Sequence, residues 1–197
     1  MNRVQIHIKR LFDVCVAAFC IVLFSPLYIV CYVAVVLEDG RPALFRQERI
    51  GLHGKPFTIF KFRSMRMDAE ANGPELSNSE YDSRLTRVGR FLRSHHLDEL
   101  PQLWNVLKGD MSFIGPRPER QYFIDQIMQH DPRYQLLYAL RPGVTSYATL
   151  YNGYTDTMDK MLRRLELDLQ YLDRWSLWLD MTILWKTFTS IVFGKHF

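Results

Sequence analysis

The chain has 197 residues, which allows one ordinary hydrophobic core and leaves little for a second domain. Lysine and arginine exceed aspartate and glutamate by 25 to 21, so the net charge is only +4. Because this excess is mild, no nucleic-acid-reading motif occurs and the basic residues form no dense block, we expect no nucleic acid among the partners.

A long uncharged run, rich in valine, isoleucine, leucine and phenylalanine, extends from Val14 to Leu37. A straight helix of this length, rising about 1.5 Å per residue, is long enough to cross the hydrocarbon core of a bilayer. The run is too long for the apolar part of a signal peptide, and no small-residue cleavage site follows it. Its cysteines, Cys15, Cys20 and Cys31, act as small apolar residues and offer no disulfide or zinc pattern. We therefore expect the protein at a membrane bilayer.

The dipeptide Ser25-Pro26 lies at the midpoint of this run and predicts a break in the helix. Proline removes one backbone donor and clashes with the preceding turn, while the serine hydroxyl can bond an upstream carbonyl. Basic residues flank the run on both sides, at Arg3, Lys9, Arg10, Arg41, Arg46, Arg49 and Lys55. Positive charge on both sides favours a re-entrant hairpin with both ends in the cytoplasm. A kinked helix that spans the membrane once is the alternative.

Two short strands, residues 43–50 and 57–65, are predicted on either side of the turn-rich segment 51–56. Alternation along the second strand places Lys61 and Arg63 on one face and two phenylalanines on the other. This basic pair either lies on a solvated strand edge or lines a phosphate pocket, and the sequence leaves both interpretations open.

Residues 68–83 are polar, contain the turn sequence Asn72-Gly73-Pro74 and lack a hydrophobic period, so we predict a mobile loop. Such a loop either closes over a site as a lid or simply connects two elements. The sequence does not distinguish these two roles.

An arginine occupies every third position from residue 84 to residue 93, with apolar residues between. These arginines are Arg84, Arg87, Arg90 and Arg93. On a helix this spacing gives a basic stripe beside an apolar one. The stripe either lies at anionic lipid headgroups, where each basic residue contributes about 1 kcal/mol, or brings Arg93 to a substrate next to Asp98.

Two adjacent carboxylates, Asp98 and Glu99, follow this stripe and precede the helix-stopping Pro101. On a helix they point about 100° apart, so they are able to reach one ligand from two sides. Adjacent carboxylates suit a divalent metal such as Mg²⁺, which binds through one or two carboxylates plus substrate phosphates. A carboxylate is also able to act as a nucleophile and form an acyl-phosphate. Alternatively, the pair caps a helix that begins at Leu97 or Leu100.

Residues 119–130 are predicted to form a helix with one apolar side, which Asp131-Pro132 ends. Residues 141–145 are predicted to form a turn that carries the cation Arg141. The small residue Gly143 in this turn would let backbone N–H groups approach a phosphate closely.

Asp156 is predicted to cap a helix whose leucine and methionine side chains, over residues 158–172, form one apolar stripe. Residues 176–193 contain Trp178 and Trp185 and few charges. A helix lying in the membrane interface fits this last segment, because tryptophan favours the headgroup level. A buried core helix is the alternative.

Together these elements predict an α+β, mainly helical fold. Residues 1–40 are expected to form a re-entrant membrane helix-break-helix. Residues 41–197 are expected to form a catalytic domain with a short β-hairpin and amphipathic interfacial helices, packed with the hairpin as one unit. No glycine-rich nucleotide loop, nucleophilic serine elbow or paired Cys-x-x-Cys occurs, which disfavours conventional nucleotide hydrolysis, serine chemistry and structural zinc.

Several short motifs follow one another along almost the whole chain. They are Lys9–Asp13, Gln47–Gly51, Gly54–Phe57, Lys61–Met65, Leu97–Gln102, Gly109–Ser112, Gly115–Pro118, Arg141–Thr145 and Ser176–Asp180. Each motif is weak alone, but in this order they make the chain resemble the bacterial monotopic phosphoglycosyl transferases, also called the bacterial sugar transferase family.

The resemblance implies transfer of a phosphosugar from a UDP-sugar to a polyprenol (undecaprenyl) phosphate, with Mg²⁺ as cofactor. The family acts on the cytoplasmic face of the bacterial inner membrane and starts the synthesis of surface glycans. By this resemblance Asp98 is the nucleophile that attacks the β-phosphorus and releases UMP, and Glu99, with Asp98, is expected to hold the metal. The covalent phosphosugar on Asp98 then passes to the lipid phosphate.

The same resemblance carries over a set of residues for substrate binding. They are Lys61, Arg63, Arg93, Arg117, Arg141, Gly143 and Thr145. Guanidinium groups suit this role because their paired donors match the oxygens of phosphates and carboxylates. Ser25 and Pro26 carry over as the break of the re-entrant membrane hairpin.

The chain departs from the family pattern after Thr145. Many relatives continue with Gly-Trp-Ala-Gln, whereas this chain has Ser-Tyr-Ala-Thr at residues 146–149, and residues 150–156 also differ. The identity of the sugar therefore stays open, while the reaction class does not depend on this region. Because no long multi-span region precedes the motifs, the chain resembles a small, stand-alone member.

Two other functions remain open from the sequence. A membrane-bound, metal-dependent phosphohydrolase would use the same carboxylates and basic residues on a nucleotide-sugar or lipid diphosphate. A non-catalytic membrane scaffold would use the carboxylates only as a helix cap.

Overall fold

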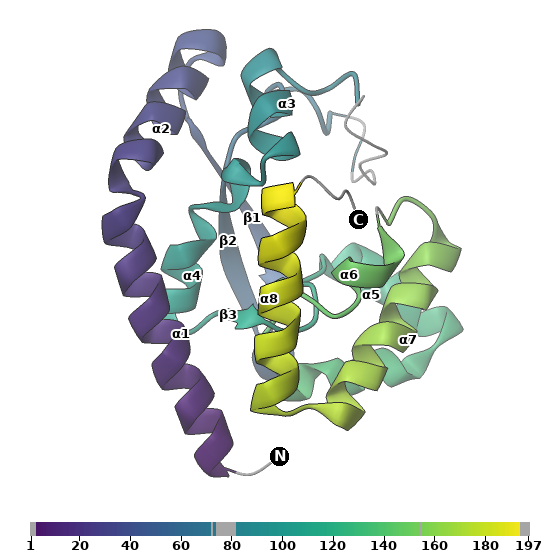
Figure 1. The fold of residues 1–197 in the computed structure, drawn as a ribbon. Helices are drawn as coiled ribbons and strands as arrows, with labels where there is room; N and C mark the ends of the chain where they lie inside the picture. The colour runs from purple at the N-terminus through teal and green to yellow at the C-terminus, as the bar shows by residue number, and fades with distance from the viewer. Residues whose placement is uncertain (1–2, 72, 74–81, 154, 194–197) are drawn as a thin grey trace.

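The computed structural model of the chain describes residues 3–71, 73, 82–153 and 155–193. The fold is mainly helical, with a short antiparallel β-hairpin near its middle (Figure 1). Helices α1 (Arg3–Leu23) and α2 (Ser25–Asp39) form a long bent column along one side, and α7 (Met158–Arg174) lies on the opposite side. The predicted combination of a mainly helical fold and a short β-hairpin is confirmed.

The column bends by 64° where α1 meets α2, at the predicted Ser25-Pro26 break. Pro26 lies in the first turn of α2, where a helix does not need the missing N–H. The hydroxyl of Ser25 donates a hydrogen bond of 2.8 Å to the carbonyl of Val22, which satisfies a group that the break would otherwise free. The predicted helix break is confirmed.

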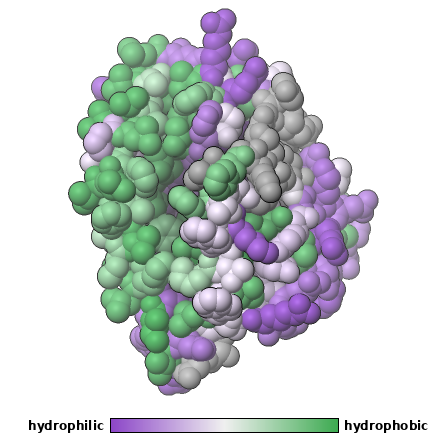
Figure 2. All heavy atoms as spheres, viewed as in Figure 1, coloured by the Kyte–Doolittle hydropathy of each residue, from purple (hydrophilic) through white to green (hydrophobic). Residues whose placement is uncertain are grey.

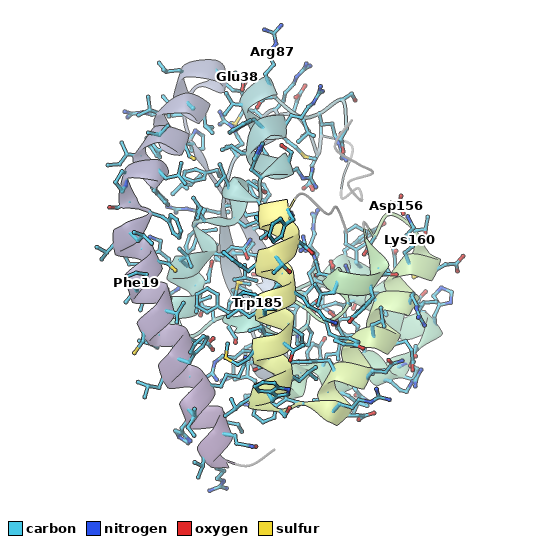
Figure 3. All side chains as sticks on the ribbon, in the orientation of Figure 1. Phe19, Glu38, Arg87, Asp156, Lys160 and Trp185 are labelled. Atoms are coloured by element: carbon cyan, nitrogen blue, oxygen red, sulfur yellow. The ribbon has the colours of Figure 1, made fainter. Side chains whose placement is uncertain are left out.

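Apolar side chains cover the outer side of this column. Figure 2 shows hydrophobic residues gathered over α1 and α2, and hydrophilic residues gathered on the opposite side, over α7. Phe19 of α1 is 65% exposed, and Figure 3 shows where it lies on the column. Within the described residues, no single helix has the length and apolarity to cross a membrane, whereas α1 and α2 meet that criterion together as a bent pair.

Polar side chains near the start of α1 attach the column to the rest of the protein. Arg10 donates hydrogen bonds of 2.6 and 2.9 Å to two carbonyls at the C-terminal end of α4 (Gln102–Lys108). The buried Asp13 accepts a hydrogen bond of 3.2 Å from the backbone N–H of Phe113. The polar part of the Lys9–Asp13 motif therefore holds α1 against the interior.

The β-hairpin consists of β1 (Leu44–Ile50) and β2 (Pro56–Phe62), joined by a 3₁₀ turn at Leu52–Gly54. The first residue of β1 pairs with the last residue of β2, so the register is simple and antiparallel. The prediction extended the second strand to Met65 and placed Arg63 on its exposed face, and both points are wrong. The strand ends before Arg63, whose side chain is buried against the end of α2.

Helix α3 (Arg87–Ser94) carries most of the arginine stripe and begins with a capping threonine. The hydroxyl of Thr86 accepts a hydrogen bond of 2.9 Å from the backbone N–H of Gly89. Gly89 is needed because a Cβ at this position would lie 1.9 Å from the Ser64 carbonyl oxygen. The prediction that Arg84 belongs to the helix is wrong, since it precedes α3 and forms an ion pair of 2.6 Å with Asp82.

A second, parallel pair of strands joins β3 (Ser112–Ile114) to β4 (Gly143–Thr145). The sequence predicted a turn at residues 141–145, and for the last three of them this is wrong. A Cβ at Gly143 would lie 2.2 Å from the backbone nitrogen of Gly115, so these segments approach closely only because Gly143 has no side chain.

Four more helical elements complete the fold beside α7. They are α5 (Gln121–His130), a 3₁₀ helix at Pro132–Ala139, α6 (Thr149–Asn152) and α8 (Leu177–Phe193). The helices predicted at residues 119–130, 158–172 and 176–193 are confirmed with slightly different ends. Ile124 of α5 packs with Met161 and Leu165 of α7 in a shared core.

The predicted cap of α7 is wrong by one residue. The N-cap is Thr157, whose hydroxyl accepts a hydrogen bond of 3.3 Å from the backbone N–H of Lys160. Asp156 instead forms an ion pair of 2.7 Å with the side chain of Lys160, and Figure 3 shows the two residues close together.

The mobile loop predicted at residues 68–83 lies mostly outside the described residues, which omit 72 and 74–81. The described part at residues 68–71 forms turns, and Glu70 within it pairs with Arg120 at 2.7 Å. The lid interpretation of this loop therefore stays a prediction.

Candidate active site

A cavity of about 1320 Å³ lies between the β-hairpin, the α3–α4 region and the C-terminal helices. Its wall is formed mainly by residues 41–49, 59–70, 93–103, 117–123, 144–153 and 187–191. This volume exceeds that of most small-molecule pockets, which hold roughly 300–1,000 Å³. The cavity is therefore large enough for a nucleotide-sized ligand together with a second group.

Asp98 and Glu99 enter this cavity from a 3₁₀ helix at Leu97–Glu99. The preceding residue, His96, has a left-handed backbone conformation with φ of 55°, which turns the chain at the end of α3. This turn leaves Asp98 only 4% exposed but still in the cavity wall. Neither this 3₁₀ helix nor α4, both fully described, has a side-chain cap, so the helix-cap alternative is wrong.

Glu99 is held by two cations that the sequence predicted near it. The Nζ atom of Lys61 lies 2.6 Å from Glu99 Oε1, and an Arg117 Nη2 atom lies 3.9 Å from the same oxygen. Burial alone would raise the pKa of Glu99, but Lys61 and Arg117 lower it to about 2. Glu99 is therefore ionised at neutral pH and fixed in position.

Asp98 has the opposite electrostatic environment. Burial raises its pKa above the ordinary value; Lys61 lowers it in part, and the neighbouring charge of Glu99 raises it again. Among the described residues, Lys61 donates its short hydrogen bond to Glu99 and not to Asp98. Asp98 is therefore a poorly solvated carboxylate that faces the cavity, whereas Glu99 is already paired.

The cavity brings together five of the seven predicted substrate-binding residues. They are Lys61, Arg63, Arg93, Arg117 and Thr145. The guanidinium of Arg63 also donates hydrogen bonds of 2.7 and 2.8 Å to the carbonyls of Asp39 and Gly40, so it anchors the end of α2.

Arg141 and Gly143 do not belong to the cavity wall. The Nε atom of Arg141 donates a hydrogen bond of 3.0 Å to the carbonyl of Gly109, where α4 ends. Gly143 allows β4 to approach Gly115, as described above. In this structure both residues support the strands and turns behind the site.

A buried ion cluster in the cavity wall was not predicted. Glu119 lies between Arg164, at 2.6 Å, and Arg49, at 3.3 Å. Burial raises the pKa of Glu119, and these two arginines outweigh that effect and lower it. The available signal was the position of Arg164 and Asp168, four residues apart on the apolar side of a predicted helix.

The site offers a small set of metal ligands. Within the described residues, no group of three or more histidine, cysteine, aspartate or glutamate side chains lies close enough to hold a metal ion. Asp98 and Glu99 supply two adjacent carboxylates in a cavity rich in cations. This oxygen-only set fits Mg²⁺, which usually takes one or two carboxylates and completes its coordination with water and substrate phosphates.

Comparison with known proteins gives a consistent match. The sequence profile described as "Bacterial sugar transferase" matches residues 4–194. The chain is 42% identical over 187 residues to a UDP-N-acetylgalactosamine-undecaprenyl-phosphate N-acetylgalactosaminephosphotransferase of Aeromonas hydrophila, with 95% of this chain and 44% of that protein covered. It is 43% identical over 187 residues to a UDP-glucose:undecaprenyl-phosphate glucose-1-phosphate transferase of Caulobacter vibrioides, with 93% and 69% covered.

The chain thus spans less than half of the Aeromonas relative and about two thirds of the Caulobacter relative. A third relative, a sugar transferase of Bacillus subtilis, is 38% identical over 188 residues, and 89% of its length is covered. Because the family profile covers almost the whole chain, the protein belongs to the bacterial sugar transferase family.

Proposed function

We propose that this protein transfers a sugar 1-phosphate from a UDP-sugar to undecaprenyl phosphate or a similar polyprenol phosphate. The observation that carries the proposal is the pair of unlike carboxylates, Asp98 and Glu99, in a large cavity lined by Lys61, Arg93 and Arg117. The names of the Aeromonas and Caulobacter relatives support these two substrate classes.

The proposed chemistry has two displacements at one phosphorus atom. A carboxylate oxygen of Asp98 attacks the sugar-linked phosphorus of the UDP-sugar, the bond to the bridging oxygen breaks, and UMP leaves with that oxygen and its electron pair. An oxygen of the lipid phosphate then attacks the same phosphorus, and the bond to Asp98 breaks to restore the carboxylate.

The surrounding residues suit the charges of this reaction. Lys61 keeps Glu99 ionised and oriented, and Arg93 and Arg117 offer guanidinium donors to phosphate oxygens. Asp98 and Glu99 would hold the Mg²⁺, which when bound neutralises phosphate charge. Burial of Asp98 leaves the nucleophile less stabilised by water than an exposed carboxylate would be.

The apolar column gives the lipid substrate a route to the cavity. We propose that α1 and α2 enter one leaflet of the bacterial inner membrane as a re-entrant hairpin, with both ends on the cytoplasmic side. The bend at Ser25-Pro26, the exposed apolar side chains and the flanking basic residues support this placement. Trp185 of α8, labelled in Figure 3, is 66% exposed and suits the headgroup level.

The proposal is tested with Asp98→Asn, and Asp125→Asn on exposed α5 serves as the matched control. We expect Asp98→Asn to abolish both UMP release and glycolipid formation with every accepted UDP-sugar, while Asp125→Asn stays near wild-type rates. An Asp98→Asn protein that still forms glycolipid would contradict the assignment. Release of free sugar phosphate without lipid transfer by the wild type would identify a phosphohydrolase instead.

A further inference from the structure

A second group of cations lines the cavity beside the carboxylates. Four guanidinium groups surround Glu119 and are here called the Glu119 cluster: Arg49, Arg117, Arg120 and Arg164. Glu119 and all four arginines belong to the cavity wall. None of Arg49, Arg120 and Arg164 was expected from the sequence to contact a substrate.

The acidic partners of this cluster are too few to neutralise it. Glu119 pairs with Arg164 and Arg49, and Glu70 pairs with Arg120. Four cations therefore face two carboxylates within the cluster itself. The nearby Asp168 adds little charge at neutral pH, because burial raises its pKa to about 7.

The guanidinium groups also repel one another. Burial is the main cause that lowers the pKa of Arg49 to about 10, and the charges of Arg117, Arg120 and Arg164 lower it further. The Nε atom of Arg49 is buried without a hydrogen-bond partner among the described residues. Such a concentration of cations is unfavourable in an empty cavity and becomes favourable when an anion is bound.

The cluster is rigidly mounted. The backbone N–H of Ile50 donates to the carbonyl of Glu119 at 3.0 Å, and Arg49 donates to the carbonyl of Pro118 at 3.2 Å. The backbone N–H of Gly143 donates to the carbonyl of Pro116 at 2.9 Å. The segment that carries Arg117 and Arg120 is therefore held from two sides before any ligand binds.

A purely structural role explains only part of the cluster. Arg164 and Arg49 bond Glu119 and hold its segment in place. Arg117 and Arg120 hold nothing in that segment. Their guanidinium groups extend to Glu99 at 3.9 Å and to Glu70 at 2.7 Å, two carboxylates of other segments in the same cavity wall.

We propose that Arg117 and Arg120, supported by Arg49 and Arg164, form a second phosphate subsite, next to the one in which Asp98 reacts. The inference rests on the proposed function, since it assigns a place to a second phosphate group of that reaction. This group belongs either to the departing nucleotide or to the lipid acceptor, because both present the same phosphate oxygens. In the structure Glu70 takes the position at Arg120 that the phosphate would occupy.

The test uses Arg120, because its side chain does not contact Glu119 and its removal leaves the buried pairs intact. Binding of UDP to the full-length protein in detergent is measured by calorimetry for wild type, Arg120→Gln and Arg120→Lys. Arg133→Gln, which removes an exposed arginine paired with Asp131 and Glu166, is the matched control. If the nucleotide supplies the phosphate, we expect Arg120→Gln to weaken UDP binding about tenfold or more and Arg120→Lys to restore part of it.

A second arm separates the two sources of phosphate. If UDP binding is unchanged but the KM for polyprenol phosphate rises by a similar factor in Arg120→Gln, the lipid phosphate occupies the subsite. Glu70→Gln is expected to tighten binding of whichever ligand responds, since it removes the competing carboxylate. The proposal is overturned if Arg120→Gln matches Arg133→Gln in both arms, or if Glu70→Gln weakens that binding.

Failure of this subsite is distinguishable from failure of the proposed function. A wild-type protein that transfers sugar phosphate while Arg120→Gln behaves as the control refutes only the subsite. A wild-type protein that neither binds UDP nor releases UMP from any UDP-sugar refutes both.

Discussion

Neighbouring carboxylates of one 3₁₀ turn have different environments in this protein. Glu99 receives Lys61 at 2.6 Å and stays ionised, whereas burial raises the pKa of Asp98, which lies in the same cavity wall. This difference gives each residue a separate task. The paired carboxylate orients ligands, and the unpaired one is available to react.

Lys61 is the residue that maintains this difference, so its removal is expected to disturb the site without unfolding the protein. We predict that Lys61→Gln lowers the rate of UMP release by about 100-fold, because Glu99 loses its closest cation. Lys61→Arg is expected to retain part of the activity. Lys160→Gln, which breaks the partly exposed pair with Asp156, should have almost no effect. Equal rates for Lys61→Gln and Lys160→Gln would refute this role.

Asp168 gives the stability a predictable pH dependence. Burial raises its pKa to about 7 in the folded protein, against about 3.9 in an unfolded chain. Between these values the folded state holds a proton that the unfolded state has released, so this residue's contribution to stability falls as pH rises toward 7. The full shift corresponds to on the order of 4 kcal/mol.

Asp168→Asn removes this dependence. We expect its thermal unfolding midpoint, measured in detergent and compared with wild type at each pH, to improve steadily from pH 5 to pH 8. Asp125→Asn, on exposed α5, should show a constant difference from wild type over that range. A constant difference for Asp168→Asn as well would show that Asp168 titrates normally in the folded protein.

At the scale of elements, the apolar column is the best-predicted part of the fold. A long uncharged run with Ser25-Pro26 at its centre allows only a bent helix, and the structure bends there by 64°. The basic and acidic residues at the edges of the run have specific partners. Lys9 pairs with Asp180 at 2.7 Å, and this links α1 to α8.

The placement of this column in a membrane is testable by labelling. In a variant without native cysteines, single cysteines are introduced at Arg3 and at Gly40, the two ends of the α1–α2 pair. We predict that a membrane-impermeant thiol reagent labels both positions only from the cytoplasmic side. A cysteine at the exposed Phe19 should resist labelling from either side. Labelling of the two ends from opposite sides would identify a spanning helix.

Elements without a strong period were not predictable. Strands β3 and β4 have three residues each, so residues 141–145 gave a turn signal instead. Arg63 left the strand face because β2 ends one residue earlier, and Arg84 left the arginine stripe because Thr86 caps α3 after it. In each case a tertiary contact or a cap outweighed the local spacing.

At the scale of the whole molecule, the protein has one apolar side and one hydrophilic side, with the cavity wall drawn from both halves of the chain (Figure 2). Asp98, Lys61, Arg93 and Arg117 were predictable because their motifs are local. The Glu119 cluster was not, because it joins β1, α7 and the segment before α5, which are distant in sequence. Contacts of this kind depend on the packed fold rather than on spacing.

The central claim, that Asp98 carries the phosphosugar, is tested most directly by intact-mass and peptide mass spectrometry. The wild-type protein is incubated with an accepted UDP-sugar and Mg²⁺ in the absence of lipid. We predict release of UMP up to one equivalent per protein and a matching phosphosugar adduct on the peptide that contains Asp98. UMP release that strictly requires polyprenol phosphate, with no adduct under any condition, would contradict the account.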